Sequence, residues 1–524
     1  MSISKLRKLV VIAPTDGADV IIKKLMSLRC IDIADFSGED GSDLLKKNDY
    51  SEQISLLENK IQKIECVICA IYSRKKKKLH FGDDRIKVSY DAITSSELDL
   101  AEEAVDNAYA LINETEGADL SALAGQLDNI RVLYDVQRTK LEEMNIKAKA
   151  AFSDNCTFIV GWMPRRAQKR VVSALDEYVC AYEIEEPKSN DEPPCRLSNN
   201  IFTRCFEWIT KEVGVSKYRT FDPTFILSIF YFLCFGLMIP DVGYGLILSL
   251  FGVSAMLISG MRGKMRSVFG MLAICGVSSM IFGVLFGGWF GNIPYAVMQN
   301  LFGIENASEI APFFGGLWFK PVLKPIWYLV VCLAIGALQI LVGMIIKFIL
   351  LCRGGRAVDA LLDILPFWLI FGAVAIAFFT SWLVGAILAI VGVLAIIIFG
   401  GRRKKGFFPR LVGGLAGVSR IALYLVALAS YLKIFVVGFG VGVVTYYINK
   451  LGTLLGGSTG GYILFVATSV VCHAICVGGA TFVAFVVAKK LQQNEFFRQF
   501  HVSDGKAFAP AEISNKYTVD ICNK

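Results

Sequence analysis

Hydrophobic and polar positions divide the 524-residue chain into two regions with different patterns. In the first region, short apolar runs of strand length alternate with amphipathic segments of helical period. Beyond about residue 223, long apolar stretches are separated by short polar connections. A helix that crosses about 30 Å of hydrocarbon needs about 20 mostly apolar residues. The pattern therefore predicts a soluble region followed by a membrane region.

The two ends of the soluble region predict one small α/β lobe. Its expected strands are 8–14, 30–36, 157–163 and 179–185. Its expected helices are 17–28 and 165–178. Between them, apolar residues at spacings of three, four and seven predict helices at 49–77 and within 96–150. Two such helices joined by a short connector predict an antiparallel coiled-coil arm. The lysines at 75–78 would form its tip, either as a solvated end or as a contact for an acidic partner.

The membrane region contains eight apolar stretches long enough to be candidate spans. They are 224–239, 243–260, 267–290, 326–351, 360–379, 382–400, 411–446 and 462–488. The seventh is much longer than a perpendicular span requires, so we expect it to be strongly tilted or bent.

Charge supports this division and predicts the orientation in the membrane. Residues 1–222 contain 32 Lys and Arg against 37 Asp and Glu, whereas residues 223–524 contain 22 against 9. Basic residues cluster in the connections after spans 2, 4 and 6, at 261–266, 353–356 and 402–405. Because cytoplasmic connections carry an excess of Lys and Arg, we expect these connections and both termini to be cytoplasmic. The excess forms no basic face interleaved with aromatic residues, so nucleic acid is not an expected partner.

The predicted fold class is an α-helical membrane protein with eight transmembrane helices, the last two long and tilted. An N-terminal cytoplasmic α/β lobe with an antiparallel coiled-coil arm precedes them. The predicted domains are a cytoplasmic domain, an amphipathic connector, a membrane domain and a cytoplasmic tail, at 1–200, 201–223, 224–490 and 491–524. The sequence has no Walker loop, dinucleotide fingerprint or zinc-ligand spacing. We therefore expect no catalytic site, cofactor or metal in this chain.

Ionisable residues within the spans are functional candidates, because burying a charge in hydrocarbon costs free energy. Lys433 lies deep in the seventh span with no acidic residue nearby in its own helix. Such a cation suits a protein whose counter-charge arrives on another subunit. Arg420 lies about 20 Å earlier along the same helix. Three cations also have a structural alternative, in which their long side chains extend to the cytoplasmic interface: Arg420, Lys489 and Lys490. Asp241 is expected to cap the tight turn between spans 1 and 2.

Several motifs, in order and at matching spacing, resemble those of the V-type ATPase a subunit, called subunit I in bacteria. The resemblance covers nearly the whole chain. The matching segments are 161–164 (GWMP), 222–224 (DPT), 241–245 (DVGYG), 282–291 (FGVLFGGWFG), 359–368 (DALLDILPFW), 495–497 (EFF) and 505–510 (GKAFAP). The resemblance implies structural roles for the motif residues Gly161, Trp162, Asp241, Tyr244, Asp359 and Asp363.

The resemblance implies the membrane stator of a rotary ATPase in the plasma membrane of a bacterium or archaeon. Such a stator holds two offset half-channels against a rotor ring of c/K-type proteolipid subunits. It thereby couples H⁺ or Na⁺ translocation to ATP synthesis or hydrolysis elsewhere in the complex. The arm would anchor peripheral stalk subunits of the E/G type, and the socket subunit of the central stalk is a further implied partner. A cation within about 4–6 Å of a ring carboxylate would lower the pKa of that carboxylate by about 1–3 units and release its ion.

The sequence departs from the family at both intramembrane arginine positions. The S-Y-x-R-L motif of span 7 has Lys433 at the arginine, and counting from His473 and back from Glu495 places Lys490 at the second arginine. Lysine can lose its charge when buried, whereas arginine keeps it. Either the motor works with lysine, or Arg420 is the operative cation, or the chain is a degenerate paralogue. The ion-translocation candidates are therefore Lys433, Lys490, Arg420, Glu495 and His473.

Two other classes of function compete with the stator. A stand-alone secondary transporter usually has internal repeats and a polar site at the midplane, and the sequence shows neither a repeat between spans 1–4 and 5–8 nor an intramembrane acid for ion coupling. A non-conducting assembly scaffold is favoured if the presence of lysine at both family arginine positions, 433 and 490, abolishes ion transport. The arm tip of about twenty residues is also shorter than the far lobe of the family, so we expect a reduced or different stalk contact.

Overall fold

The computed structural model describes residues 3–36, 45–74, 85–88, 95–114, 125–188, 191–218, 220–257, 263–304, 306–454 and 459–520. Most of them are helical. The chain forms two compact units. The first comprises Met1–Ser198, Ile258–Met261 and Gly505–Lys524, and the second comprises Asn199–Leu257 and Arg262–Asp504.

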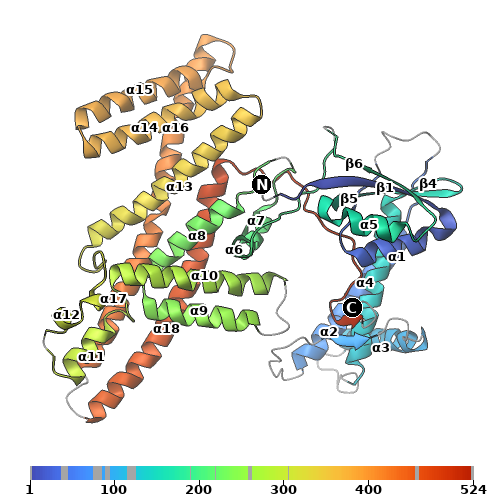
Figure 1. Ribbon diagram of the computed structural model, residues 1–524, viewed down its shortest axis with the longest axis horizontal. Helices are drawn as coiled ribbons and strands as arrows, with labels where there is room; N and C mark the ends of the chain where they lie inside the picture. Colours follow the sequence, from blue (N-terminus) through green and yellow to red (C-terminus); the bar gives the residue numbers. More distant parts are fainter. Residues whose placement is uncertain are drawn as a thin grey trace. The chain divides into compact units, whose positions relative to one another are not determined.

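An antiparallel five-stranded sheet forms the lobe of the first unit. Its strand order is β2-β5-β1-β6, with β4 paired to β5. The strands are β1 (Leu6–Pro14), β2 (Asp32–Ile33), β4 (Ala151–Phe152), β5 (Cys156–Pro164) and β6 (Ala181–Glu185). Helices α1 (Ala18–Leu28) and α5 (Gln168–Leu175) lie side by side against the sheet (Figure 1). The alternating apolar residues of β1 and the apolar stripe of α1 meet in one buried core, as their periods of 2 and 3.6 require.

The arm of the first unit consists of three helices. They are α2 (Ser51–Arg74), α3 (Ser95–Glu114) and α4 (Leu127–Lys149). The expected helix region at 96–150 contains both α3 and α4, and residues 115–124 between them lie outside the described residues. The apolar stripes of the three helices share one core that includes Ile64, Ala108 and Leu133. The lysines at 75–78 lie outside the described residues.

The C-terminal tail is part of the first unit. A bridge pairs Cys195 with Ala507, and Ala511 donates a backbone hydrogen bond of 2.8 Å to Ile31 of the lobe. Further along, β7 (Thr518–Asp520) pairs in parallel with β3 (Ile86–Val88) beside the arm. The tail therefore contacts both the lobe and the arm.

The second unit is a bundle of apolar helices preceded by the short helices α6 (Ile201–Arg204) and α7 (Glu207–Val213). The bundle helices are α8 (Thr224–Met238), α9 (Val242–Leu257), α10 (Gly263–Phe286), α11 (Ile293–Leu301), α12 (Ala307–Ile310), α13 (Pro325–Arg353), α14 (Ala357–Phe379), α15 (Trp382–Gly400), α16 (Phe407–Ser430), α17 (Leu432–Leu454) and α18 (Thr459–Leu491). Among the described residues, six helical stretches are long and apolar enough to cross a membrane. Helices α8 and α9 are apolar but have only 15 and 16 residues.

The expected seventh span consists of two helices, α16 and α17, that meet end to end at Tyr431. The ring of Tyr431 is fully buried, and its hydroxyl donates a hydrogen bond of 3.0 Å to Gln339 Oε1 of α13. Gly336 makes room for it, because a Cβ there would lie 2.4 Å from Tyr431 Cγ. This interruption places Lys433 in the first turn of α17, and the expected tilt or bend of the span stays a prediction.

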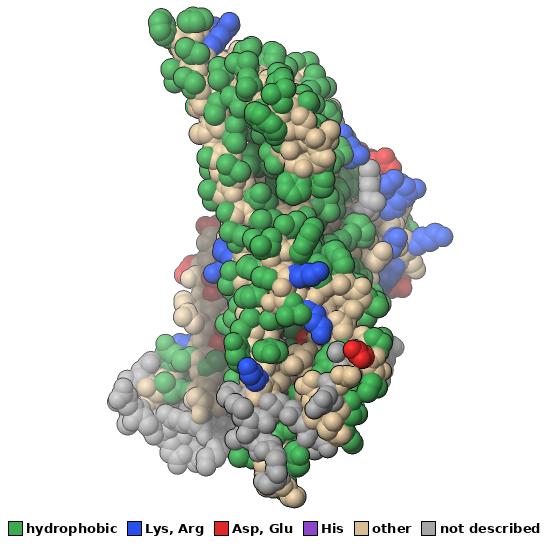
Figure 2. Space-filling model, turned by 90° about the vertical axis from the view of Figure 1, so that its left-hand side faces the viewer, with side chains coloured by type: hydrophobic (Ala, Val, Ile, Leu, Met, Phe, Trp, Pro, Cys, Tyr) green, Lys and Arg blue, Asp and Glu red, His purple; other side chains and the backbone are tan. Residues whose placement is uncertain are grey.

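The surface of the second unit is apolar over large areas. Helix α15, for example, exposes Leu383, Ile390 and Ile398 by 55%, 60% and 66%. Figure 2 shows a face of the molecule on which hydrophobic side chains predominate and basic side chains lie singly among them. Such surfaces are expected where a protein meets hydrocarbon or another subunit.

Candidate functional site

Lys433 is an isolated cation on an apolar surface. It lies well inside the apolar stretch Phe407–Lys450, and its side chain is exposed. Its neighbours Leu432 and Val436 are 39% and 63% exposed. Within the part of the chain that the structure describes, Lys433 makes no ion pair. The position can therefore receive a carboxylate from outside this chain.

Lys490 and its neighbour Lys489 lie in the last turn of α18 and differ in their contacts. Lys489 forms an ion pair of 2.7 Å with Glu212 and lies 5.2 Å from the ring centre of Trp208. Lys490 is exposed and makes no ion pair with any described residue. Of the two lysines, Lys490 is thus the one that makes no ion pair within the described part of the chain.

Arg420 lies on α16 at the junction of two cavities. One cavity, of about 160 Å³, is lined by Arg420, Glu495, Arg498 and Lys347 together with Tyr424, Leu423, Ala427 and Gln499. The other, of about 280 Å³, shares Arg420, Lys347 and Tyr424. The structure therefore brings two of the predicted residues, Arg420 and Glu495, to one polar cavity. Lys433 and Lys490 do not line it.

His473 belongs to a buried polar network with Asp241 and Tyr244. Tyr244 Oη lies 2.7 Å from His473 Nδ1, and His473 Nε2 lies 2.9 Å from Asn449 Oδ1. The amide nitrogen of Asn449 donates to the backbone oxygen of Phe290 at 2.8 Å, so its oxygen is free to accept from His473 Nε2. Nδ1 of the neutral imidazole then accepts from Tyr244. This arrangement satisfies a neutral His473 completely.

Asp241 fixes the turn between α8 and α9, as expected from the sequence. Its side chain is 3% exposed and accepts backbone N–H groups of Tyr244, Phe290 and Gly291 at 3.0, 3.0 and 2.7 Å. Three such donors satisfy the hydrogen-bonding capacity of a buried carboxylate. A cavity of about 350 Å³ adjoins Asp241 and includes Lys320 in its wall.

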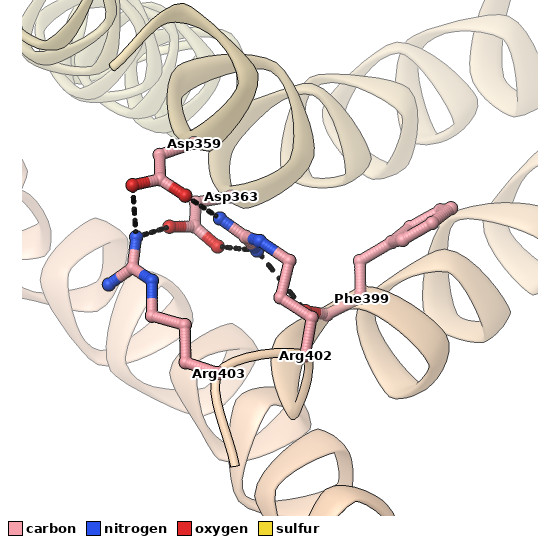
Figure 3. A network of polar contacts seen from close by, with 5 residues as sticks. All are labelled: Asp359, Asp363, Phe399, Arg402 and Arg403. Atoms are coloured by element: carbon pink, nitrogen blue, oxygen red, sulfur yellow. Dashed lines mark hydrogen bonds and ion pairs between the residues drawn. The ribbon is translucent and has the colours of Figure 1, made fainter. Parts of the chain in front are cut away.

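Asp359 and Asp363 form a four-membered ion-pair network with Arg402 and Arg403 (Figure 3). Arg402 Nη2 lies 2.6 Å from Asp359, and Arg402 Nη1 lies 2.5 Å from Asp363. Arg403 Nη2 contacts the second oxygens of the same carboxylates at 2.8 and 3.2 Å. The network ties the start of α14 to the connection between α15 and α16, which gives this motif a structural role.

Gly161 and Trp162 lie in β5 of the first unit. A Cβ at Gly161 would lie 2.9 Å from Ile31 and 3.0 Å from the backbone oxygen of Asp32, so the position needs glycine for close strand packing. Trp162 pairs with Asp32 across the sheet and is 6% exposed. Both residues support the lobe and lie in a different unit from the predicted ion-translocation residues.

Sequence reasoning overlooked Lys347, which lines both polar cavities around Arg420. A signal for it was present, since Lys347 is a single cation in the apolar run 326–351. The cavity partner Arg356 gave no comparable signal, because it lies in a basic connection.

The six long apolar helical stretches of the second unit have the length and composition of the spans of a multi-pass membrane protein. Residues 50–296 match the V-type ATPase 116kDa subunit family. The chain is similar to the A-type ATP synthase subunit I of Thermococcus kodakarensis, with 28% identity over 72% of this chain and 57% of the relative. It is also similar to the A-type ATP synthase subunit I of Methanocaldococcus jannaschii, with 25% identity over 76% of this chain and 61% of the relative. The V-type ATP synthase subunit I of Borreliella burgdorferi is 24% identical over 54% of this chain and 48% of the relative.

This chain is thus similar to the V-type ATPase 116kDa subunit family over residues 50–296, slightly less than half of its length, and to relatives named A-type or V-type ATP synthase subunit I over a larger part. It spans between about half and three fifths of the length of these relatives.

Proposed function

We propose that this chain is the membrane stator subunit of a V/A-type rotary ATPase. It would form ion half-channels against a rotor ring and couple H⁺ or Na⁺ translocation to ATP synthesis or hydrolysis in other subunits. The observation that carries the proposal is Lys433, an exposed cation within an apolar helical surface that makes no ion pair among the described residues.

The physical argument rests on what a lysine in hydrocarbon requires. A charged side chain deep in a bilayer is costly unless it meets a counter-charge or water. A ring subunit that presents one carboxylate to Lys433 would supply that counter-charge. While the two groups are within about 4–6 Å, the cation favours the ionised carboxylate, and the carboxylate releases its bound ion.

The proposed topology has eight spans with both termini in the cytoplasm. The six long apolar stretches support it, and α8 and α9 are the additional spans. At 1.5 Å per residue these two helices are only about 22–24 Å long, and short spans are accommodated by local thinning of the bilayer. The basic connections at 353–356 and 402–405 would then be cytoplasmic.

The proposed partners follow from the family and the two units. The ring of c/K-type subunits would contact the second unit, and E/G-type stalk subunits would bind the arm of the first unit. The socket subunit of the central stalk is a further proposed contact.

Arg420 supports a second version of the same function. It shares a polar cavity with Glu495 and Lys347, which is the environment expected for a cation that acts on ions. A non-conducting assembly scaffold remains the alternative class, because both family arginines are replaced by lysine at 433 and 490.

The test is ATP-driven ion uptake by the whole complex reconstituted in liposomes, with Lys433→Ala, Lys433→Arg and Arg420→Ala compared with wild type. We expect Lys433→Ala to abolish uptake while assembly and ATP hydrolysis persist. Lys433→Arg should retain uptake, because arginine keeps the charge. Lys324→Ala is the matched control, since Lys324 is exposed and makes no ion pair with a described residue.

Two outcomes would contradict this assignment. Loss of uptake in Arg420→Ala but not in Lys433→Ala would make Arg420 the operative cation. A wild-type complex that moves no ions, although its ring and active ATPase head are bound, would favour the scaffold.

A further inference from the structure

Basic side chains surround the larger of the two cavities that Arg420 lines. The cavity has a volume of about 280 Å³, close to the lower limit of about 300 Å³ for ligand sites. Its charged lining consists of Lys347 of α13, Arg356 before α14, Arg402 and Arg403 before α16, Arg420 of α16, and Asp363. Two separate helices and two connections thus direct positive charge to one place.

The carboxylates around this cavity do not balance its cations. Asp359 and Asp363 pair with Arg402 and Arg403 (Figure 3). Lys347, Arg356 and Arg420 make no ion pair with any residue that the structure describes. In the neighbouring cavity, Glu495 is accompanied by Arg498, so it adds no net negative charge.

The excess of positive charge favours an anion that the described residues do not provide. Like charges around a partly enclosed cavity repel one another more strongly than in water, because the surrounding dielectric constant is lower. The ion-pair network also holds the guanidinium groups of Arg402 and Arg403 in fixed positions. A site that is already ordered loses less entropy when it binds its ligand.

The position of the cavity favours a lipid as the source of that anion. Lys347 lies six residues before the end of α13 at Arg353, which is about 9 Å along the helix axis. The helices that form the walls also expose apolar side chains: Leu361 of α14 is 48% exposed, and Leu411 and Leu415 of α16 are 41% and 54% exposed. A molecule with a phosphate group at the cavity and acyl chains along these helices matches both features.

We propose that this cavity binds the phosphate group of an anionic phospholipid. Arg356 and Arg420 would donate hydrogen bonds to the phosphate oxygens, and the ammonium group of Lys347 would add a further positive charge. Basic pockets between membrane helices on the cytoplasmic side bind such headgroups, and the proposed topology places this cavity on that side. The proposal requires that the second unit is in the membrane but does not depend on ion translocation.

The test uses the full chain, purified in detergent and stripped of lipid. Native mass spectrometry then measures binding of dioleoyl phosphatidylglycerol, with dioleoyl phosphatidylcholine and inorganic phosphate as separate probes. Each basic side chain near the phosphate is expected to contribute about fivefold in affinity, so Lys347→Gln with Arg356→Gln should weaken phosphatidylglycerol binding about thirtyfold. Arg356→Lys should recover most of the binding lost in Arg356→Gln.

Arg266→Gln is the matched control, because Arg266 is exposed in the first turn of α10 and makes no ion pair with a described residue. Its phosphatidylglycerol binding should equal that of wild type. Equal binding of phosphatidylcholine and phosphatidylglycerol, or no change in the double variant, would overturn the proposal. Displacement of the lipid by low millimolar inorganic phosphate would also overturn it, since the ligand would then be a free anion. Gel filtration of each variant confirms that it is folded.

Discussion

Asp135 holds the C-terminal tail against the arm, and its substitution gives the sharpest test of the first unit. The side chain is fully buried on α4. One carboxylate oxygen accepts from Ser514 Oγ and Lys516 N at 2.7 and 3.1 Å. The other accepts from Tyr517 N, Thr518 N and Thr518 Oγ1 at 2.9, 2.8 and 2.7 Å. All five donors come from the tail.

The expected loss of tail-docking free energy follows from these hydrogen bonds and from the behaviour of the tail once they are removed. A hydrogen bond to a charged group contributes roughly 1.5–3 kcal/mol. Without the carboxylate, however, the tail can leave the site and bond to water, so the loss is limited to the free energy of tail docking. For Asp135→Ala we expect a loss of about 3–4 kcal/mol. Asp135→Asn should lose about 2 kcal/mol, because one acceptor oxygen becomes a donor that faces other donors.

Hydrogen exchange of the full chain in detergent measures this effect at the tail amides. A loss of about 3–4 kcal/mol corresponds to faster exchange of about 10²–10³-fold at residues 516–518. Asp128→Asn is the matched control on the same helix, since the Asp128 side chain is 69% exposed and its carboxylate contacts Arg131 at 3.3 Å. It should change exchange by less than about twofold. Unchanged protection of the tail amides in Asp135→Ala would refute the assignment of Asp135 as the anchor.

Three further substitutions test other contacts of the full chain in detergent. Arg402→Lys should lower the free energy of unfolding by about 1–2 kcal/mol, because lysine cannot bond two carboxylates with one planar fork; an unchanged melting midpoint would contradict this. Gly161→Ala should cost about 1–3 kcal/mol in the lobe, because the new Cβ would lie 3.0 Å from the backbone oxygen of Asp32; hydrogen exchange of β5 reports it. A hydrogen bond from Tyr134 lowers the pKa of Glu65. Its stabilising effect is therefore present above the unfolded pKa of about 4.3 and lost as the pH falls through the lower folded pKa. Glu65→Gln should accordingly flatten the acid side of the stability profile, and a profile identical to wild type would exclude this role.

The boundaries of the long apolar helices could be predicted from the sequence. The expected spans 326–351 and 382–400 correspond to α13 (Pro325–Arg353) and α15 (Trp382–Gly400). Hydropathy succeeds here because the length of an apolar run and the polar residues at its ends are local properties. The break at Tyr431 is different, because it depends on the fit of one ring against Gly336 and Gln339 of another helix.

Long-range contacts of the first unit could not be predicted either. Nothing local in the tail indicates that Thr518 hydrogen-bonds Asp135, which lies 383 residues earlier. The periodic apolar residues of the arm predicted helices with apolar stripes, but such a stripe does not indicate how many helices pack against it. The division of residues 96–150 into α3 and α4 therefore required the structure.

Part of the candidate site could be located from the sequence because charged residues are rare within the apolar stretches. Lys433 and Arg420 were identified because a cation within an apolar run is unusual. The same signal applied to Lys347, but its importance appears only when α13 and α16 bring it beside Arg420 in one cavity. A single sequence does not show which charges converge.

The pairing of charges in the second unit separates structural groups from groups available to a partner. Arg402 and Arg403 meet two carboxylates, and Lys489 meets Glu212. Lys433 is exposed, lies far from the ends of its apolar stretch and makes no ion pair among the described residues. Lys490 lies in the last turn of α18, where a long side chain reaches the interface and water. Water can thus compensate Lys490, whereas Lys433 calls for a second protein or a water-filled path, and the rotor ring and half-channels that we propose would provide both.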